Sequence, residues 1–239
     1  MQRFYINSNI SNTLWWQNFI ISDNEILHQI IKVLRSSIWD NFIFFDGVRN
    51  IDFVYKITSI DKKNIIFHLV DEILKPKEVQ NIHLYQAIPN KIDKIELILQ
   101  KWVEVGYNSF CFFKADRSQK LFISDNKIDR LKKIIKEAVE QTGRNTIPSL
   151  DFISKLDIKN IPWDKYFFHT NTTNSKKIKD IDFKNKISLI IWPEGWFSDE
   201  EVSLLESWEV IKINLWNNIL RTETTPIVVW FYINQTKIL

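Results

Sequence analysis

The stretch that decides the fold is IIWPEGWFSDEE, residues 190–201. The apolar run 187–191 predicts a buried strand, and Ser198 followed three residues later by Glu201 predicts a capping box that opens a helix. A tight Pro-Glu-Gly turn at 193–195 joins the two. Because α/β proteins hold ligands at the carboxyl ends of strands in this strand–turn–helix geometry, we expect a ligand loop here. A tryptophan on each side of the turn is unexpected, because a backbone must approach the ligand there.

The composition is that of an ordinary globular protein. The chain has 239 residues, of which 45% are hydrophobic and 26% charged, enough for one large domain or two smaller ones. The apolar run at 227–233 is far shorter than a membrane span, and residues 1–5 lack the apolar core of a signal peptide. We therefore expect no membrane association.

Other residue types narrow the class of protein further. The single cysteine, Cys111, excludes an internal disulfide and suits a reducing cytoplasm. The four histidines are scattered without metal-ligand spacing, so we expect no metal site. The net charge of +3 permits a nucleic-acid partner without requiring one, and a mildly basic solvated surface explains it equally well.

Two residue counts are abnormal. The chain has 4 glycines and 10 tryptophans, whereas average usage would give roughly 17 glycines at this length. A genome poor in G and C would deplete glycine, but it would not add tryptophan.

The order of elements predicts an amino-terminal β-rich module followed by an α/β domain. Residues 1–72 contain aromatic and β-branched runs of strand length and one helix after Asp23 or Asn24. Residues 75–77 form a proline-marked linker. Beyond them strands alternate with helices, which predicts a parallel sheet. The expected strands are 82–87, 109–113, 166–168, 187–191 and 210–215, and the expected helices are 91–105 (with Gly106 as C-cap), one from about 125 to 143, and 198–207.

Three blocks then resemble one family. Residues 191–198 look like the Ile-Gly-Pro-Glu-Gly-Gly-Phe-Ser loop of the SPOUT-class methyltransferases that methylate N3 of a uridine in small-subunit ribosomal RNA. Residues 215–224 resemble that family's second signature, Leu-Gly-x-x-Ile-Leu-Arg-Thr-Glu-Thr. Residues 137–144, with Ile147 and Pro148 after them, are similar to a third block. The blocks occur in the family's order and span most of the chain.

The resemblance implies a fold and a function. It implies a PUA-like β-barrel that binds RNA at residues 1–72 and a SPOUT methyltransferase domain with a trefoil knot at 73–239. It further implies a cytoplasmic homodimer that binds S-adenosylmethionine in the knot and methylates N3 of a uridine in 16S ribosomal RNA, without a metal.

The chain departs from the family in one consistent way. Six tryptophans stand where the family usually has glycine, or in the last case glycine or alanine: Trp192, Trp196, Trp216, Trp39, Trp208 and Trp102. Glycine in such turns allows positive φ and close approach of the backbone to a ligand, and an indole blocks both. We hypothesise that the source genome reads UGA as glycine, so that UGA codons have been translated as tryptophan. UGG codons at positions 192, 196 and 216 would exclude this hypothesis.

The resemblance also implies site residues. The cofactor would be held, mainly through backbone groups, by Ile191, Trp192, Pro193, Glu194, Gly195, Trp196, Leu215, Trp216, Ile219 and Leu220, with the loop at His169 and Thr170 as a third candidate. Glu194 suits a turn-stabilising carboxylate better than a catalytic base. Arg221 and Glu223 are the catalytic candidates, through stabilisation of a uridine anion and acceptance of its proton, but an internal Arg–Glu pair that locks the knot explains them equally well.

RNA contact is expected from basic side chains in both parts of the chain, with Lys32, Arg35, Arg117 and Arg144 as candidates. Each of these is also explained by a solvated charge, and Arg144 by a local pair with Glu140 four residues earlier. Two alternatives to the main function remain open. The first is a related SPOUT enzyme with another target nucleotide. The second, which applies if the pocket tryptophans are real, is a catalytically inactive RNA-binding protein.

Overall fold

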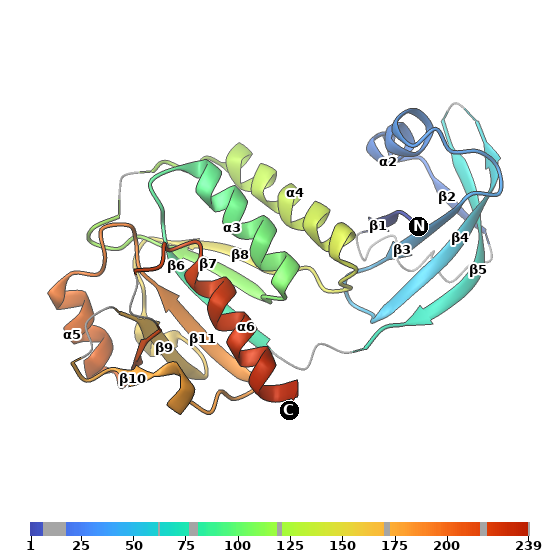
Figure 1. Cartoon of the computed structure of the whole chain (residues 1–239). Coiled ribbons are helices and arrows are strands. Elements are labelled where there is room, and N and C mark those ends of the chain that lie inside the picture. Colours follow the sequence, from blue (N-terminus) through green and yellow to red (C-terminus); the bar gives the residue numbers. More distant parts are fainter. Residues whose placement is uncertain are drawn as a thin grey trace. The chain divides into compact units, whose positions relative to one another are not determined.

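The computed structural model describes residues 1–6, 18–61, 63–76, 81–118, 121–169, 173–215 and 219–238. The chain divides into two compact units (Figure 1). The first comprises Met1–Lys77 together with Val139–Ile147, and the second comprises Glu78–Ala138 together with Pro148–Leu239. None of the helices in the described part of the chain combines the length and apolar composition that crossing a membrane requires.

The first unit is built on a five-stranded sheet with the order β1-β3-β4-β5-β2. Its strands are β1 (Arg3–Tyr5), β2 (Asn18–Ile21), β3 (Asn41–Phe45), β4 (Ile51–Ile60) and β5 (Ile65–Leu74). Aromatic side chains fill its core, and the Phe44 ring meets Phe67 edge-on at 5.0 Å between centroids. The predicted β-rich module is therefore confirmed. The sequence indicates strands at 4–6, 41–45, 52–57 and 65–69, so β2 is additional and β4 and β5 are longer than expected.

The helix of the first unit starts where the sequence predicts. The Asp23 carboxylate accepts hydrogen bonds from the N–H groups of Glu25 and Ile26 at 3.0 Å and caps α2 (Asn24–His28). The helix then continues as a π-helical turn, η1 (Gln29–Val33).

A network of buried polar side chains joins the segment 139–147 to the sheet of the first unit. Arg3 Nη2 donates to Asp52 Oδ1 at 2.6 Å and to Asn145 Oδ1 at 2.8 Å. Asn145 Nδ2 also donates to Asp52 Oδ1, at 2.9 Å. The Tyr5 N–H donates to Glu140 Oε1 at 2.8 Å, so the Glu140 carboxylate binds the β1 backbone.

The second unit is an α/β layer in which all the described strands pair in parallel, as predicted. The sheet order is β10-β12-β9-β11-β6-β7-β8. Its strands are β6 (Asn81–Ala87), β7 (Ser109–Phe113), β8 (Ser149–Ile153), β9 (Asp164–Phe168), β10 (Lys176–Lys177), β11 (Lys186–Ile191) and β12 (Ile211–Asn214). The adjacent strands β6 and β11 lie at the centre of the sheet. Strands β7 and β8 follow on the β6 side, and β9, β12 and β10 follow on the β11 side. The carboxyl ends of β6 and β11 therefore mark the switch point, where ligands bind in open α/β sheets.

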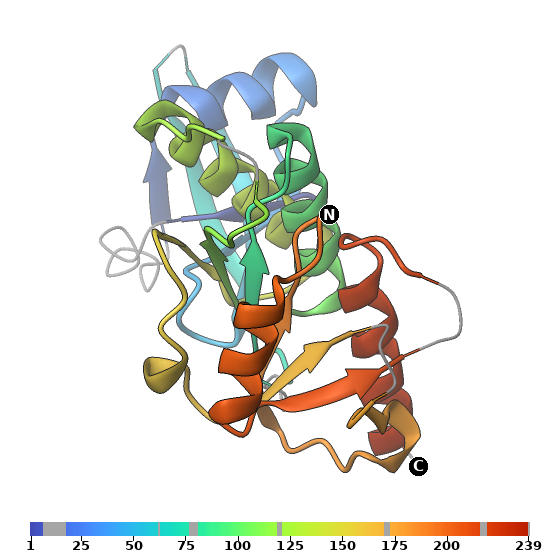
Figure 2. The same ribbon diagram turned by 90° about the vertical axis from the view of Figure 1, so that its left-hand side faces the viewer.

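Four helices accompany this sheet: α3 (Ile92–Val105), α4 (Asp125–Thr142), α5 (Asp199–Ser207) and α6 (Thr225–Ile238). The last four residues of α4 belong to the first unit. Helix α3 ends at Gly106, whose φ of 109° confirms the predicted C-cap. Figures 1 and 2 show α6 beside α3. The hydroxyl of Tyr107, just after α3, donates to the carbonyl of Pro226, in the first turn of α6, at 2.8 Å. The sequence predicted only an apolar tail at 227–233, because a helix that is apolar all round has no helical periodicity.

Candidate functional site

The loop between β11 and α5 has the predicted strand–turn–helix geometry. The Trp196 N–H donates to the Pro193 carbonyl at 3.0 Å and closes the turn. Ser198 and Glu201 form the expected capping box, in which the Glu201 N–H donates to Ser198 Oγ at 3.1 Å and the Ser198 N–H donates to Glu201 Oε2 at 2.9 Å. The Ser198 hydroxyl also donates to Asp116 Oδ2 at 2.9 Å, which ties the start of α5 to the segment after β7.

Glu194 holds the loop to the start of α3. Its Oε1 accepts from Lys94 Nζ at 2.6 Å and from the Asn90 N–H at 3.1 Å. Burial alone would raise the pKa of Glu194, but these donors bring it below its usual value. A carboxylate held ionised by a lysine is a poor proton acceptor, so the geometry favours a turn-stabilising role for Glu194 over catalysis.

Two indoles occupy the loop. The rings of Trp192 and Trp196 stack with their centroids 4.7 Å apart and their planes 15° apart. Trp192 is 5% exposed, and Trp196 has a φ of 63°. His169, at the end of β9, meets Trp196 edge-on at 5.9 Å. The side chains of the loop thus pack on one another where the backbone should approach a ligand.

The structure joins the two predicted cofactor segments through a residue that the sequence did not single out. The Thr222 hydroxyl donates to the Trp192 carbonyl at 2.7 Å. Leu215 and Leu220 are half-buried and Ile219 is 69% exposed, whereas Trp216 lies outside the described residues. The loop 191–196 and the segment that contains Thr222 are therefore in direct contact in the second unit.

The catalytic candidates form a loose pair. Arg221 Nη1 lies 3.9 Å from Glu223 Oε1, and the Arg221 side chain is 85% exposed while that of Glu223 is 17% exposed. Such a contact contributes little to stability. The geometry does not fit an internal pair that locks the fold, and it leaves the Arg221 guanidinium at the surface.

Burial lowers the pKa of His169, with Lys212 acting in the same direction, so this imidazole beside the loop is neutral near pH 7. Among the described residues no His, Cys, Asp and Glu side chains cluster in a way that could hold a metal ion.

The four candidate RNA contacts are divided between the units. In the first unit, Lys32 lies in η1 and Arg35 follows its end, and both are exposed. Half-buried Arg144 belongs to the segment 139–147 of that unit, and its carbonyl accepts from Arg3 Nη1 at 3.1 Å. Arg117 lies in the second unit, where its Nη1 donates to the Gly195 carbonyl at 3.3 Å. Of the four, only Arg117 contacts the loop 191–196 directly.

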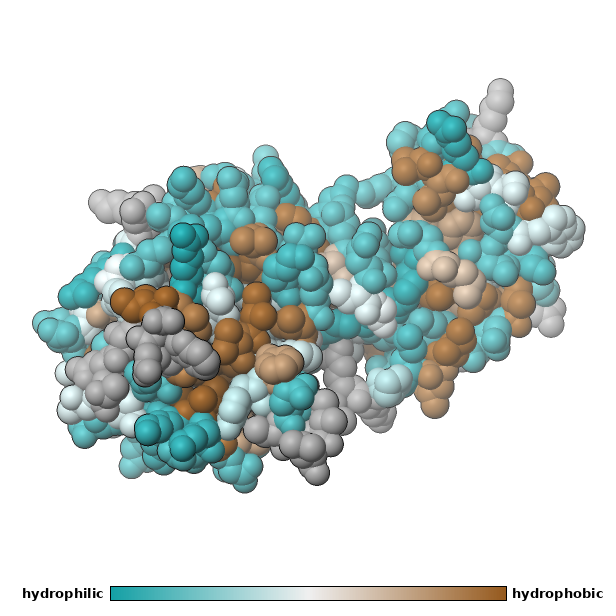
Figure 3. All heavy atoms as spheres, viewed as in Figure 1, coloured by the Kyte–Doolittle hydropathy of each residue, from teal (hydrophilic) through white to brown (hydrophobic). Residues whose placement is uncertain are grey.

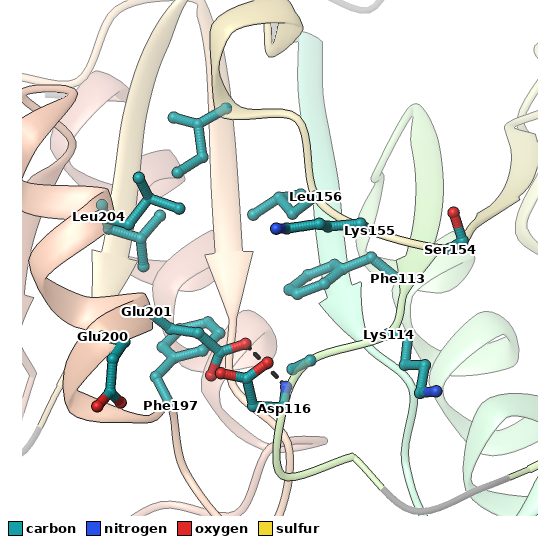
Figure 4. Close-up of a pocket in the computed structure, with 13 residues that line it drawn as sticks. Phe113, Lys114, Asp116, Ser154, Lys155, Leu156, Phe197, Glu200, Glu201 and Leu204 are labelled. Atoms are coloured by element: carbon teal, nitrogen blue, oxygen red, sulfur yellow. Dashed lines mark hydrogen bonds between the residues drawn. The ribbon is translucent and has the colours of Figure 1, made fainter.

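A pocket of about 510 Å³ is lined by Phe197, the residue that follows this loop (Figure 4). It is formed by α5 and by the segments that follow β7 and β8. Figure 4 shows Lys155 extending across it above Phe113, with Phe197, Glu201 and Asp116 at its base. Sequence reasoning missed this pocket because three segments far apart in the chain form it, and no local pattern predicts that they meet.

The capping box allows a first prediction. Replacing Ser198 with alanine removes the acceptor for the Glu201 N–H and the donor to Asp116, so we expect the free energy of unfolding to fall by about 1–2 kcal/mol in urea denaturation. Ser198→Thr keeps the hydroxyl and should lose less than half of that. Equal stability of the two variants would contradict the role assigned to the cap.

Comparison with known proteins identifies the family of the chain. Residues 75–234 match the family model described as an RNA methyltransferase domain. The chain is 34% identical over 238 residues to ribosomal RNA small subunit methyltransferase E of Buchnera aphidicola from Acyrthosiphon pisum, covering 95% of this chain and 90% of that protein. It is 26% identical to the Bacillus subtilis protein of the same name, over 100% and 98% of the two chains.

Solved structures resemble the whole chain. The crystal structure of a ribosomal RNA small subunit methyltransferase E from Neisseria gonorrhoeae, bound to S-adenosylmethionine, has a TM-score of 0.85 at 26% identity and covers 99% of this chain and 98% of that one. A putative methyltransferase from Legionella pneumophila in complex with S-adenosylmethionine has a TM-score of 0.84 at 27% identity, with the same coverage.

A parallel sheet with a strand–turn–helix loop at its switch point is typical of α/β proteins that bind a ligand at the carboxyl edge. The family model narrows this class to RNA methyltransferases. The chain belongs to the ribosomal RNA small subunit methyltransferase E family.

Proposed function

We propose that this protein uses S-adenosylmethionine to methylate N3 of a specific uridine in 16S ribosomal RNA. The observation that carries the proposal is the bond between the Trp192 carbonyl and Thr222, because it brings the two signature segments of the family together at the sheet edge. The relatives named for small-subunit ribosomal RNA and the two neighbours with bound S-adenosylmethionine support the same substrate and cofactor.

The finer architecture follows from the family resemblance. We assign residues 1–72 to a PUA-like β-barrel that binds RNA, and residues 73–239 to a SPOUT domain whose carboxyl-terminal segments form a trefoil knot. Two contacts of the second signature support this arrangement. Thr222 binds the loop 191–196, and Trp102 Nε1 donates to the Glu223 carbonyl at 3.4 Å.

The cofactor does not fit the loop with its present side chains. The stacked indoles of Trp192 and Trp196 occupy the space beside the backbone groups that would hold it. Glycine at both positions would remove 2 indoles from the loop and suit the positive φ at 196. The proposed activity is therefore that of a chain with glycine at 192, 196 and 216. With genuine tryptophans, the stacking favours a catalytically inactive RNA-binding protein.

The residues beyond the cofactor segment suit the chemistry that N3 methylation needs. S-adenosylmethionine supplies an activated methyl group, and uridine N3 becomes nucleophilic when its proton leaves. The exposed Arg221 guanidinium would stabilise the uridine anion, and the less exposed Glu223 would accept the proton or orient Arg221. Arg117 would contact RNA phosphate beside the loop, with Lys32, Arg35 and Arg144 contributing from the first unit. The target uridine would have to leave its helix to reach the methyl group.

A second copy of the chain is the proposed partner of α3 and α6. Phe231 is 60% exposed, Leu97 45% and Val228 36%, and Figure 3 shows hydrophobic side chains gathered over α6. An apolar surface of this kind is typical of a protein–protein interface, so we assign it to a homodimer. We place the protein in the cytoplasm, where ribosomal RNA is its substrate.

The function is tested by deleting the gene and analysing the nucleosides of small-subunit ribosomal RNA by mass spectrometry. We expect 3-methyluridine to disappear and to return when the gene is supplied again. Unchanged 3-methyluridine, together with loss of another methylated nucleoside, would identify a related enzyme with a different target.

A further inference from the structure

Gln86 is a buried amide at the carboxyl end of β6. It is 1% exposed, and its Nε2 faces three acceptors: the Ala87 carbonyl at 2.8 Å, Thr222 Oγ1 at 2.8 Å and the Trp192 carbonyl at 3.2 Å. These contacts fix the orientation of the amide, because exchanging its oxygen and nitrogen would place the oxygen against the two carbonyls. Gln86 thus joins β6 to the loop 191–196 and to the segment after 219.

Thr222 completes a three-way contact. It is 2% exposed, receives its bond from Gln86 and donates its own proton to the Trp192 carbonyl at 2.7 Å. The carbonyl of residue 192 therefore accepts from two buried side chains. Because both bonds go to the backbone, they do not depend on whether residue 192 is tryptophan or glycine.

The buried amide has a cost that packing alone does not explain. The Gln86 Oε1 atom is buried and has no hydrogen-bond partner among the described residues, and an unmet buried acceptor is destabilising. A leucine of similar size would fill the same space without this cost. The compensating gain must come from the Nε2 bonds, which hold the loop.

We propose that Gln86 and Thr222 are positioning residues of the methyltransferase site, which hold the carbonyl of residue 192 and thereby set the spacing of the two cofactor segments at the switch point. The proposal rests on the proposed function. Neither residue is assigned a contact with the methyl group or with RNA. Their effect is on the geometry of the backbone that binds S-adenosylmethionine.

Two measurements test this role. The first is amide hydrogen exchange of residues 192–197 and 221–225 in the chain with tryptophan at 192, 196 and 216. The second is the affinity for S-adenosylmethionine, measured by calorimetry in the chain with glycine at these three positions. Gln86→Leu and Thr222→Val should each raise exchange in these segments about tenfold and weaken cofactor binding about 10- to 100-fold. Thr222→Ser, which keeps the hydroxyl, and Gln141→Leu, at an exposed position of α4, should stay within about twofold of the parent.

The outcomes separate the positioning role from the function. Gln86→Leu removes the unmet acceptor but also the three Nε2 bonds, so the thermal unfolding of each variant is measured as well. A variant that is fully folded at the temperature of the titration excludes unfolding as the cause of weaker binding. Exchange and affinity that both remain within about twofold in Gln86→Leu and Thr222→Val would overturn the proposal. If the two variants exchange faster but the chain with glycine at 192, 196 and 216 binds no S-adenosylmethionine, the coupling of the segments is supported and the proposed function is contradicted.

Discussion

Replacing Trp192, Trp196 and Trp216 with glycine is expected to create measurable S-adenosylmethionine binding in a chain that otherwise binds it at least about a hundredfold more weakly. Overpacking a tight site costs about 1–3 kcal/mol per change, and three indoles lie in the predicted cofactor segments. The stack of Trp192 on Trp196, at 4.7 Å, accounts for two of them. Calorimetric titration of both forms with S-adenosylmethionine provides the measurement.

The backbone supports the same expectation independently of the family resemblance. Six described residues other than glycine have positive φ, and three of these are tryptophans: Trp39 at 83°, Trp163 at 63° and Trp196 at 63°. A bulky residue at positive φ is a rare outlier, and the left-handed region costs it roughly 1–2 kcal/mol. Glycine adopts it readily. Trp192 is outside this group, so its replacement acts by making space.

A matched control separates the cofactor site from a general effect of removing indoles. Trp208 stands where the family usually has glycine, but it lies at the end of α5, is 47% exposed and has a φ of −96°. Trp208→Gly should leave cofactor affinity unchanged. If the chain with its three tryptophans binds S-adenosylmethionine as tightly as the triple glycine variant, the tryptophans are compatible with the site. The recoding hypothesis then loses its physical basis.

Asp52→Ala should lower the free energy of unfolding by about 3–5 kcal/mol, because it leaves a buried arginine without its counter-ion. Asp52 is 2% exposed and accepts from Arg3 Nη2 at 2.6 Å and from Asn145 Nδ2 at 2.9 Å. Arg3 itself is 8% exposed. Such a loss is a large part of the total stability of a domain, so we expect urea unfolding to show a marked drop in midpoint.

The exposed Asp71 of β5 serves as the control, and Asp71→Ala should change stability by less than about 0.5 kcal/mol. Asp52→Asn keeps one acceptor oxygen and should fall between the two variants. A loss below about 1 kcal/mol in Asp52→Ala would show that solvent or neighbouring carbonyls already satisfy Arg3.

Local patterns explain why the candidate site was largely predictable. The apolar run, the Pro-Glu-Gly turn and the Ser198–Glu201 capping box lie within 15 consecutive residues, so the sequence alone indicated a strand, turn and helix. Gly106 and Asp23 likewise acted as the helix-terminal residues that their types predict. Signals of this kind depend on neighbouring residues and need no tertiary information.

Long-range contacts explain what the sequence could not indicate. Gln86 and Thr222 are 136 residues apart, and neither belongs to a pattern that predicts their hydrogen bond. The positive φ of Trp163 was not predicted for a different reason, because no family block covers that residue. At the end of α5 the resemblance pointed to Trp208, whereas the positive φ falls on Glu209, at 56°.

Methyl transfer in vitro is the decisive assay for methylation of uridine N3 by this protein. The chain with glycine at 192, 196 and 216 is incubated with labelled S-adenosylmethionine and small ribosomal subunits that lack the modification, and the digested RNA is analysed by mass spectrometry. We expect label in 3-methyluridine at a single site with the glycine chain, and little or none with the chain that has tryptophan at these positions. Label in a different nucleoside, or no transfer by the glycine chain, would contradict it.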